Sequence, residues 1–337
     1  MKILVRAANW IGDAVMSLPA LRAIRSRYPD SHITVIAKPW VVDLYEGERS
    51  VNSIIRLDNT APWRQAIGLR RECFDLAVLL PNSFHSAALL FLTGAKRRIG
   101  YARDARSLLL TDPIAVPKPG EVPRHERFYC LELLRRAGII DCLPDITEIR
   151  LDGADAAGLR GEKLFAQHEV RLPVVGVSPG AAYGGAKRWL PERFSEAATR
   201  LASETGASVA VFGSASERAL CQEVANSCGG RNFAGGTTLR QFIDMTAACR
   251  FFLTNDSGAM HIAAALGVPS VTVFGPTDET ATGPSGSNAR LVREPVECAP
   301  CKLRECPIDH RCMTRVTVDQ VVEAAVSGVR LRGCRQP

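Results

Sequence analysis

Short apolar segments alternate with helical repeats along the whole chain. Segments typical of buried strands lie at 2–7, 32–37, 53–57, 74–80, 174–178, 208–213, 250–254 and 270–275. Between them, apolar residues recur every three or four positions, as at Val15, Leu18, Leu21 and Ile24, and this spacing predicts helices. In the second half it predicts helices at 191–205, 216–227, 239–248 and 257–266.

The alternation restarts after a region containing Pro, Gly and Asp at 144–161. Repeated strand–helix units form parallel sheets that helices cover on both faces. We therefore expect an α/β protein of two Rossmann-like, doubly wound domains, at 1–160 and 161–337. Ligands of such domains bind beyond the carboxyl ends of the strands. The loops in that position are 9–13, 178–188, 213–217 and 254–261.

Composition supports two globular domains and disfavours other classes of protein. The chain has 337 residues, 46% hydrophobic and 23% charged, with both signs mixed, which is not typical of disorder. The apolar run before Arg6 is too short for a signal peptide, and polar residues interrupt the uncharged stretch at 76–95, so no membrane span is expected. We expect a cytoplasmic protein with reduced thiols.

The formal net charge is +7, and much of the excess lies in the first half. The residues concerned are Lys96, Arg97, Arg98, Arg103, Arg106, Arg124, Arg127, Arg135 and Arg136. They form either a solvated surface or a face for an anionic partner. A phosphorylated small molecule or a lipid fits better than nucleic acid, because no basic stretch rich in aromatic residues occurs.

Common nucleotide-binding and protease motifs are missing from the sequence. No G-x-G-x-x-G follows a predicted strand, and neither a P-loop nor H-E-x-x-H occurs. A dehydrogenase is therefore disfavoured, although the predicted fold would suit one.

Two loops of the second half have the features of a phosphate site. At 254–258 a strand ends in Thr-Asn-Asp-Ser-Gly, where Asp256 or Ser257 can cap a helix whose amides attract anions, and His261 follows one turn later. A plain capped helix is the alternative. The glycine-rich loop at 178–189 ends in Lys187-Arg188-Trp189, and its lysine supplies a charge for phosphate. Together the loops indicate a diphosphate ligand.

In the first half, Asn9-Trp10-Ile11-Gly12-Asp13 follows the first predicted strand. The simpler interpretation of Asp13 is a helix N-terminal acid that the helix dipole favours. The alternative is a general base at a ligand site.

Four cysteines, Cys298, Cys301, Cys306 and Cys312, gather near the C-terminus. They are interpreted either as a structural zinc site or oxidised pair, with His310 as a substitute ligand, or as free packed thiols. Their spacing is irregular compared with paired C-x-x-C motifs, and nothing else in the sequence suggests an iron–sulfur cluster.

The ordered motifs at 9–13, 80–84, 179–189, 254–261 and 275–277 resemble those of the bacterial ADP-heptose:lipopolysaccharide heptosyltransferases, glycosyltransferase family 9, and among them the heptosyltransferase II type most. The resemblance covers essentially the whole chain. Departures occur at Ala182 and Gly185, where an acidic residue and a proline are common, and at Leu190, an extra residue before Pro191. These differences bear on sugar and acceptor preference more than on chemistry.

The resemblance implies a GT-B fold whose two domains face a central cleft, with the acceptor on the N-terminal domain and the ADP-sugar on the C-terminal one. It implies that the C-terminal helix packs back on the N-terminal domain, and that Asp13 is the catalytic base. The implied ADP-heptose residues are Ser178, Gly180, Lys187, Arg188, Glu217, Thr237, Leu239, Asp256, Ser257, Gly258 and His261. The implied acceptor-side residues are Asn9, Gly12, Asn82 and Ser83. No catalytic metal is implied, because no D-x-D occurs.

The function implied is inverting transfer of heptose from ADP-L-glycero-β-D-manno-heptose to the first heptose of the lipopolysaccharide inner core. The expected partner is an anionic Kdo–lipid A glycolipid, reached in the cytoplasm with peripheral contact at the inner membrane, and no nucleic acid. Heptosyltransferase I or another sugar-nucleotide transferase of the family is the nearest alternative. A GT-B-like sugar-nucleotide epimerase or a nucleotide-binding module is the alternative outside the transferases.

Overall fold

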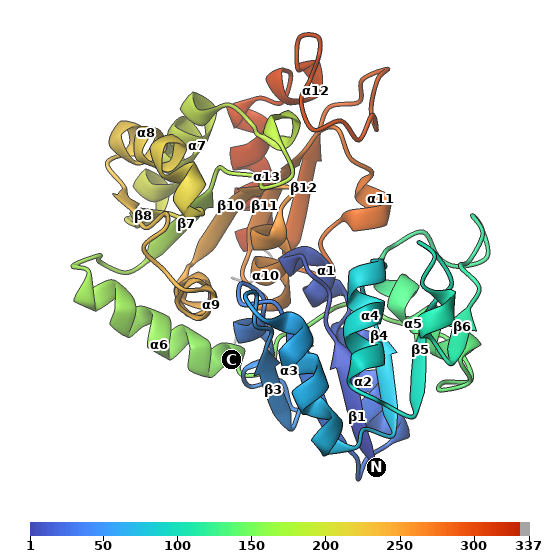
Figure 1. Cartoon of the computed structure of the whole chain (residues 1–337). Coiled ribbons are helices and arrows are strands. Elements are labelled where there is room, and N and C mark those ends of the chain that lie inside the picture. Colours follow the sequence, from blue (N-terminus) through green and yellow to red (C-terminus); the bar gives the residue numbers. More distant parts are fainter. Residues whose placement is uncertain (331–337) are drawn as a thin grey trace. The chain divides into compact units, whose positions relative to one another are not determined.

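The computed structural model describes residues 1–330 and divides the chain into two compact units, Met1–Ile146 and a second unit that starts at Thr147. The division precedes the predicted boundary at 160/161. The reason is helix α6 (Ala154–Gln167), which packs along α9 (Leu239–Ala248) and so belongs to the second unit. Figure 1 labels the elements of both units.

The first unit is a parallel six-stranded sheet in the order β3-β2-β1-β4-β5-β6. Its strands are β1 (Lys2–Arg6), β2 (His32–Ala37), β3 (Ser53–Arg56), β4 (Leu76–Leu79), β5 (Arg97–Tyr101) and β6 (Asp112–Ile114). Its helices are α1 (Ile11–Met16), α2 (Leu18–Arg27), α3 (Pro62–Gly68), α4 (Phe84–Leu92) and α5 (Arg127–Arg136), with short 3₁₀ turns η1 (Val42–Tyr45), η2 (Leu69–Glu72) and η3 (Ser107–Leu109).

The second unit repeats this plan, in the order β12-β11-β10-β7-β8-β9. Its strands are β7 (Val174–Ser178), β8 (Ser208–Val211), β9 (Arg231–Asn232), β10 (Phe251–Asn255), β11 (Ser270–Phe274) and β12 (Ala289–Arg293). Besides α6 and α9 it has α7 (Pro191–Thr205), α8 (Arg218–Cys228), α10 (Gly258–Ala265), α11 (Glu279–Thr282), α12 (Arg311–Thr314) and α13 (Val318–Arg330), with 3₁₀ turns η4 (Gly185–Lys187) and η5 (Ala215–Glu217).

Each sheet has one place where the chain reverses its progress across the strands. In the first sheet this switch point lies between β1 and β4, and in the second between β7 and β10. All pairings are parallel, so the loops that follow these strands meet at one edge of each sheet. In open α/β sheets that edge is where ligands bind.

Helix α7 illustrates how the sequence determines these boundaries. Pro191 occupies the first turn, where its missing N–H leaves no bond unmade, and Gly206 ends the helix with φ +63°. Between them an apolar stripe that includes Phe194, Ala198 and Leu201 is buried against the second sheet.

The described part of the C-terminal helix packs on the second unit. Val321, Val322 and Ala325 of α13 join the core formed with α7 and the second sheet. Residues 331–337 lie outside the described residues, and the expected packing of this helix on the N-terminal domain stays a prediction. Within residues 1–330 no helix has both the length and the apolarity needed to cross a membrane.

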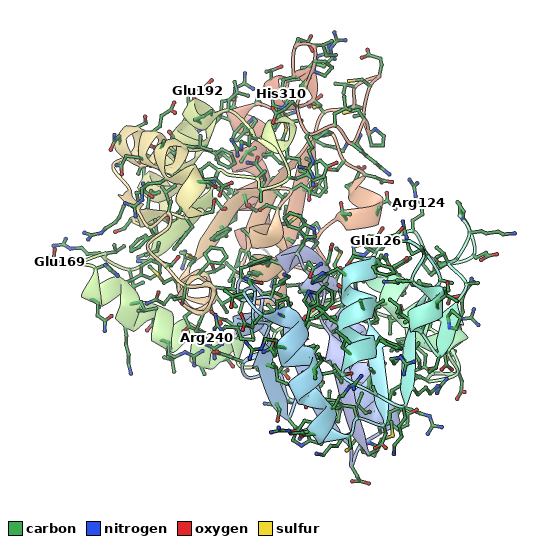
Figure 2. The ribbon with its side chains drawn as sticks, in the orientation of Figure 1. Arg124, Glu126, Glu169, Glu192, Arg240 and His310 are labelled. Atoms are coloured by element: carbon green, nitrogen blue, oxygen red, sulfur yellow. The ribbon has the colours of Figure 1, made fainter. Side chains whose placement is uncertain are left out.

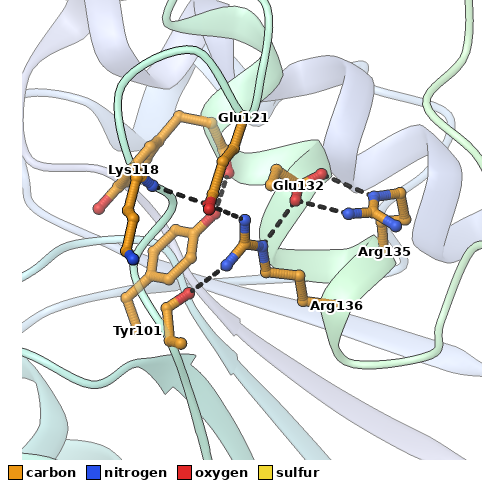
Figure 3. A network of polar contacts seen from close by, with 8 residues as sticks. Tyr101, Lys118, Glu121, Glu132, Arg135 and Arg136 are labelled. Atoms are coloured by element: carbon orange, nitrogen blue, oxygen red, sulfur yellow. Dashed lines mark hydrogen bonds and ion pairs between the residues drawn. The ribbon is translucent and has the colours of Figure 1, made fainter.

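A network of ion pairs uses part of the predicted basic face (Figure 3). The buried Glu132 carboxylate accepts hydrogen bonds from Arg135 at 2.7 Å and from Arg136 at 2.6 Å. Hydrogen bonds from Arg135 are the main reason that the pKa of Glu132 lies below its usual range. Arg136 also pairs with Glu121 at 2.7 Å. These two arginines therefore stabilise the first unit and do not form an open cationic surface.

Other members of the basic group are also engaged inside the unit. The Lys96 ammonium lies 2.8 Å from Oδ1 of Asp75. Arg106 is fully buried and donates hydrogen bonds to the carbonyl oxygens of Tyr101, at 2.7 Å, and Pro81. Much of the surplus positive charge of the first half thus fixes loops and strand ends.

We predict opposite effects of two alanine substitutions on α6, where the helix meets α9. A Cβ at Gly161 would lie 2.0 Å from the carbonyl oxygen of Asp244, whereas one at Gly158 would have its nearest neighbour, the Ala247 oxygen, at 3.5 Å. Gly161→Ala should lower the free energy of unfolding of the second unit by about 1–3 kcal/mol. Gly158→Ala should raise it by about 0.5–1 kcal/mol, through helix propensity.

Urea unfolding of the full chain, followed by circular dichroism, measures both effects. Equal shifts of the unfolding midpoint in the two variants would show that close approach of α6 to α9 is unimportant for stability.

Candidate active site

A buried ion pair joins the loops that follow the two central strands of the second sheet. Lys187, from the β7 loop, places Nζ 2.6 Å from Oδ2 of Asp256, from the β10 loop. The two side chains are 12% and 5% exposed. Thr277 donates a hydrogen bond to the same carboxylate oxygen at 2.5 Å, and the Lys187 ammonium lies 4.9 Å from the centre of the Tyr183 ring. The predicted pair of phosphate loops thus meets at this ammonium.

Asn255 fixes the β7 loop at both of its ends. Its side-chain oxygen accepts a hydrogen bond from the Trp189 amide at 2.9 Å, and its side-chain nitrogen donates to the Pro179 oxygen at 2.7 Å. The residue is completely buried at the end of β10. The sequence motifs did not single out Asn255 by itself, although a polar amide at the end of a buried strand is a signal that could have found it.

The segment that carries the four cysteines braces the β7 loop from outside. The amide of Ala186 donates to the Arg304 oxygen at 2.9 Å, and the amide of Gly185 donates to Oε1 of Glu305 at 2.9 Å. His310, labelled in Figure 2, places Nε2 2.7 Å from the Ala186 oxygen. We call residues 302–310 the brace. It holds the loop immediately before Lys187.

The brace leaves no room for a side chain at Gly184, where it presents backbone atoms, whereas at Gly185 a flexible carboxylate would have to move. A Cβ at Gly184 would lie 2.3 Å from the Arg304 oxygen, and one at Gly185 would lie 2.4 Å from the Glu305 carboxylate. The hydroxyl of Tyr183 also donates to the Lys302 oxygen at 2.8 Å. The glycine-rich composition of the loop therefore serves contact with the chain itself as well as any approach to a ligand.

Helix α10 begins at Gly258, two residues after Asp256 of the buried ion pair. Ser257 is its N-cap and Gly258 its first residue, but the Ser257 side chain makes no capping hydrogen bond and lies 3.3 Å from Oγ1 of Thr254. Within residues 1–330 the cap expected from Asp256 or Ser257 is therefore not formed, and the Asp256 carboxylate accepts hydrogen bonds from Lys187 and Thr277. The first-turn amides are left for another acceptor, such as a phosphate. His261 is buried one turn along the helix.

Glu217 lies against the start of the β7 loop. Its Oε2 accepts hydrogen bonds from the amide and hydroxyl of Ser214, at 2.9 and 2.7 Å, and its Oε1 lies 3.9 Å from Arg188. A Cβ at Gly180 would lie 2.2 Å from Oε1. Ser178 is buried at the end of β7. Gly180, Arg188 and Glu217 therefore lie close together, and Glu217 also caps a turn.

Thr237 and Leu239 lie at the start of α9, on either side of its N-cap, Thr238. Both are partly exposed. Within residues 1–330 no hydrogen bond or ion pair joins them to Lys187, so their predicted role in holding adenine rests on the resemblance alone.

In the first unit, the predicted acceptor residues follow β1. Asn9 accepts a hydrogen bond from Arg6 at 2.6 Å through its side chain, and from the Trp40 indole at 2.9 Å through its backbone oxygen. Gly12 and the exposed Asp13 lie in the first turn of α1. Burial, and then the charge of Asp13, raise the pKa of the Cys130 thiol to about 12.

The residues after β4 are held mainly by the first unit itself. Asn82 accepts a hydrogen bond from Arg106 at 3.0 Å and donates one to the Tyr129 hydroxyl at 3.1 Å. Ser83 is the N-cap of α4 and accepts a hydrogen bond from the amide of Ser86 at 3.3 Å. Their positions at the switch point agree with a ligand site, but their polar groups already have partners.

The four cysteines are free thiols. Cys298 and Cys301 are exposed, Cys306 is half-buried and Cys312 is buried. Burial, together with the neighbouring thiols, raises the pKa of Cys312 to about 11. Within residues 1–330 no group of three or more His, Cys, Asp or Glu side chains is arranged to hold a metal ion. The zinc hypothesis gains no support from this arrangement.

Taken together, the second unit presents a buried cation beside uncapped helix amides. Such groups stabilise negative charge that develops on a phosphate leaving group, because they are fixed before the reaction begins. The site therefore suits a ligand that carries a diphosphate.

Comparisons with known proteins agree with this geometry. Residues 63–311 match the family model of glycosyltransferase family 9 (heptosyltransferase). Lipopolysaccharide heptosyltransferase 2 of Escherichia coli is 34% identical over 310 residues, which cover 87% of this chain and 88% of that protein. Lipopolysaccharide heptosyltransferase 1 of Pseudomonas aeruginosa is 32% identical over 341 residues, covering 91% and 87%.

The fold comparison gives the same result. The structure of the E. coli ADP-heptose lipopolysaccharide heptosyltransferase II superposes with a TM-score of 0.84 at 29% identity, over 99% of this chain and 100% of that one. This match confirms the expected α/β class, a GT-B fold of two Rossmann-like domains. The chain is a glycosyltransferase and belongs to glycosyltransferase family 9, the heptosyltransferases.

Proposed function

We propose that this protein transfers heptose from ADP-L-glycero-β-D-manno-heptose to the first heptose of the lipopolysaccharide inner core, with inversion at the anomeric carbon. The observation that carries the proposal is the Lys187–Asp256 pair beside the uncapped N-terminus of α10. Relatives named heptosyltransferase 2 in several bacteria support the choice of sugar and acceptor. The proposed acceptor is an anionic Kdo–lipid A glycolipid, used in the cytoplasm at the inner membrane.

In this proposal the second unit binds the donor. Lys187 and the amides of Ser257 and Gly258 hold the diphosphate, and Asp256 keeps the ammonium in place between catalytic cycles. The residues proposed around the rest of the nucleotide are Ser178, Gly180, Arg188, Glu217 for the ribose, Thr237 and Leu239 for adenine, and His261 behind the diphosphate.

The first unit would bind the acceptor and supply the base. Asp13 takes the proton from the attacking hydroxyl, with Asn9, Gly12, Asn82 and Ser83 on the acceptor side. A carboxylate is a sufficient base because the sugar gains oxocarbenium character as the ADP departs. Since Lys187 and helix dipoles can neutralise the leaving group, the proposed reaction needs no metal ion.

The test of the function is acceptor-dependent release of ADP. Purified protein with ADP-heptose and a heptosylated Kdo–lipid A acceptor should release ADP at a rate that a chelator leaves unchanged. An acceptor lacking the first heptose distinguishes the heptosyltransferase I type. Isomers of the sugar nucleotide formed without acceptor would indicate an epimerase, and binding of ADP-heptose without turnover would indicate a binding module.

Replacement of Lys187 should weaken the binding of phosphate more than that of the nucleoside. Lys187→Met removes a charge-assisted hydrogen bond, so the Kd for ADP should rise by about 10- to 100-fold. The Kd for adenosine should stay within about twofold, since adenosine carries no phosphate. Calorimetry with both ligands measures the difference, and Lys163→Met, on α6, is the matched control. Equal losses for ADP and adenosine would contradict a phosphate role.

Replacement of Asp13 should affect turnover without affecting the donor. Asp13→Asn removes the proposed base, so kcat should fall by about 10²- to 10⁴-fold. The Kd for ADP should not change, because Asp13 makes no contact with the nucleotide in this proposal. Steady-state kinetics together with ADP calorimetry check the prediction. A loss of ADP affinity as large as the loss of rate would show that Asp13 is not the base.

A further inference from the structure

The loops at the carboxyl edge of the first sheet carry a row of exposed aromatic rings. Trp10 follows β1, Trp40 follows β2, Trp63 follows β3 and Phe84 follows β4, with exposed fractions of 59%, 50%, 41% and 51%. The remaining tryptophan, Trp189, is buried in the second unit. All the exposed indole rings therefore lie at the edge where a doubly wound sheet binds its ligand.

Contacts between side chains connect these loops. The Trp40 indole donates to the Asn9 oxygen at 2.9 Å, and the Lys38 ammonium lies 5.5 Å from the centre of the Trp40 ring. Lys38 also donates to Oδ1 of Asn59 at 3.2 Å, in the loop that leads to Trp63. We call Lys38, Trp40, Trp63 and His85 the edge cluster.

The last member of the cluster comes from α4. The rings of Trp63 and His85 lie 4.6 Å apart, centre to centre, and helices α3 and α4 pack together beneath them. These contacts restrict the rings before a ligand binds. Stacking of a ligand on them therefore costs less side-chain conformational entropy.

Lys38 gives the edge cluster its positive charge. Within residues 1–330 neither Lys38 nor the buried Arg6 behind it forms an ion pair, and Nε of Arg6 has no hydrogen-bond partner. Burial, followed by the charge of Arg6, lowers the pKa of Lys38. Burial, followed by Lys38 and Arg6, lowers the pKa of His85. By contrast, carboxylates pair with Arg97 on β5 and with Arg135 and Arg136 on α5.

We propose that the edge cluster binds an acidic sugar of the acceptor, whose ring stacks on Trp40 and Trp63 and whose anionic group pairs with the Lys38 ammonium, beside the His85 ring. The inference rests on the proposed function and names the part of the acceptor that this unit recognises. Indole faces bind the C–H face of a sugar, and an unpaired ammonium supplies the charge that a carboxylate or phosphate requires.

An acidic sugar fits these residues better than a membrane surface does. Tryptophans at a bilayer interface lie with their rings at the level of the lipid headgroups, where the indole N–H contacts headgroups and water. In the edge cluster the Trp40 N–H is already bound to a backbone oxygen and the Trp63 ring is packed on His85. A charged side chain also lies against the Trp40 ring, which suits a polar ligand.

The test uses Lys38→Ala and Trp63→Ala in the full-length protein. Each should raise the acceptor KM by about tenfold, the loss of one charge-assisted or stacking contact, and leave the KM for ADP-heptose within about twofold. Lys96→Ala and Phe91→Ala are the matched controls. Lys96 pairs with Asp75 at the start of β5, and Phe91 lies near the C-terminal end of α4. Neither control should alter the acceptor KM.

The form of the acceptor identifies the anionic group. A soluble heptosyl-Kdo saccharide carries a carboxylate but neither phosphate nor lipid. A similar loss with this saccharide and with the full acceptor means that the carboxylate is bound, and a loss only with phosphorylated acceptors means that a phosphate is bound. Both results support an acidic-sugar site.

Three results would overturn the proposal. Unchanged acceptor KM in both variants would show that the cluster does not touch the acceptor. A donor KM that rises as much as the acceptor KM would indicate a general defect. A loss confined to lipid-linked acceptor, matched by weaker binding to anionic vesicles without acceptor, would make the cluster a membrane contact.

A binding measurement separates this inference from the proposed transfer reaction. Quenching of intrinsic tryptophan fluorescence by the saccharide should be strong in the native protein and weak in Lys38→Ala, whether or not ADP is released. Quenching without turnover would contradict the proposed reaction and support the site. Turnover with equal quenching in the native and Lys38→Ala proteins would support the proposed reaction and contradict the site.

Discussion

Removing an ammonium and a carboxylate from water costs several kcal/mol per ion, and their attraction repays that only when the geometry is well fixed. Lys187 and Asp256 are in this situation, at the end of the second sheet. Neighbouring groups hold the pair in place. Thr277 binds the carboxylate, Asn255 binds both ends of the β7 loop, and the brace contacts that loop from outside. The glycines of the loop follow from the same requirement, since larger residues would collide with the brace.

The distribution of charge in the first unit shows why net charge alone is a poor guide to a binding surface. Arg97 on β5 and Arg135 and Arg136 on α5 belong to the positive excess, yet they are paired with Asp112 and Glu132. Lys38 contributes a single charge, and among the described residues no carboxylate forms an ion pair with it. A ligand responds to the local field, so one unbalanced lysine between aromatic rings is more informative than a group of neutralised arginines.

Several elements could be predicted from the sequence to the residue, because their signals are local. β2, β7, α7 and α9 have the predicted bounds. β5, β6, β9 and β12 were not predicted. β5 opens with Arg97 and Arg98, β6 has three residues including Pro113, β9 has two residues, and β12 contains two arginines among its five residues. Pairing with neighbouring strands, rather than local apolar pattern, makes these segments into strands.

For the site, the two phosphate loops were predictable because each has its own glycine, capping and charge signals. Their connection through Lys187 and Asp256 depends on strand order, which local pattern does not determine. Asn255 and the brace were not predicted in these roles, since their importance depends on partners far away in the chain.

The brace also has a consequence for engineering within the family. The β7 loop and the brace are more than a hundred positions apart in the sequence. Hydrogen bonds at Ala186, Gly185 and Tyr183 nonetheless join them. A chimaera that exchanges only the β7 loop would therefore lose contacts that this loop makes with the brace. Exchanging both segments together would keep them.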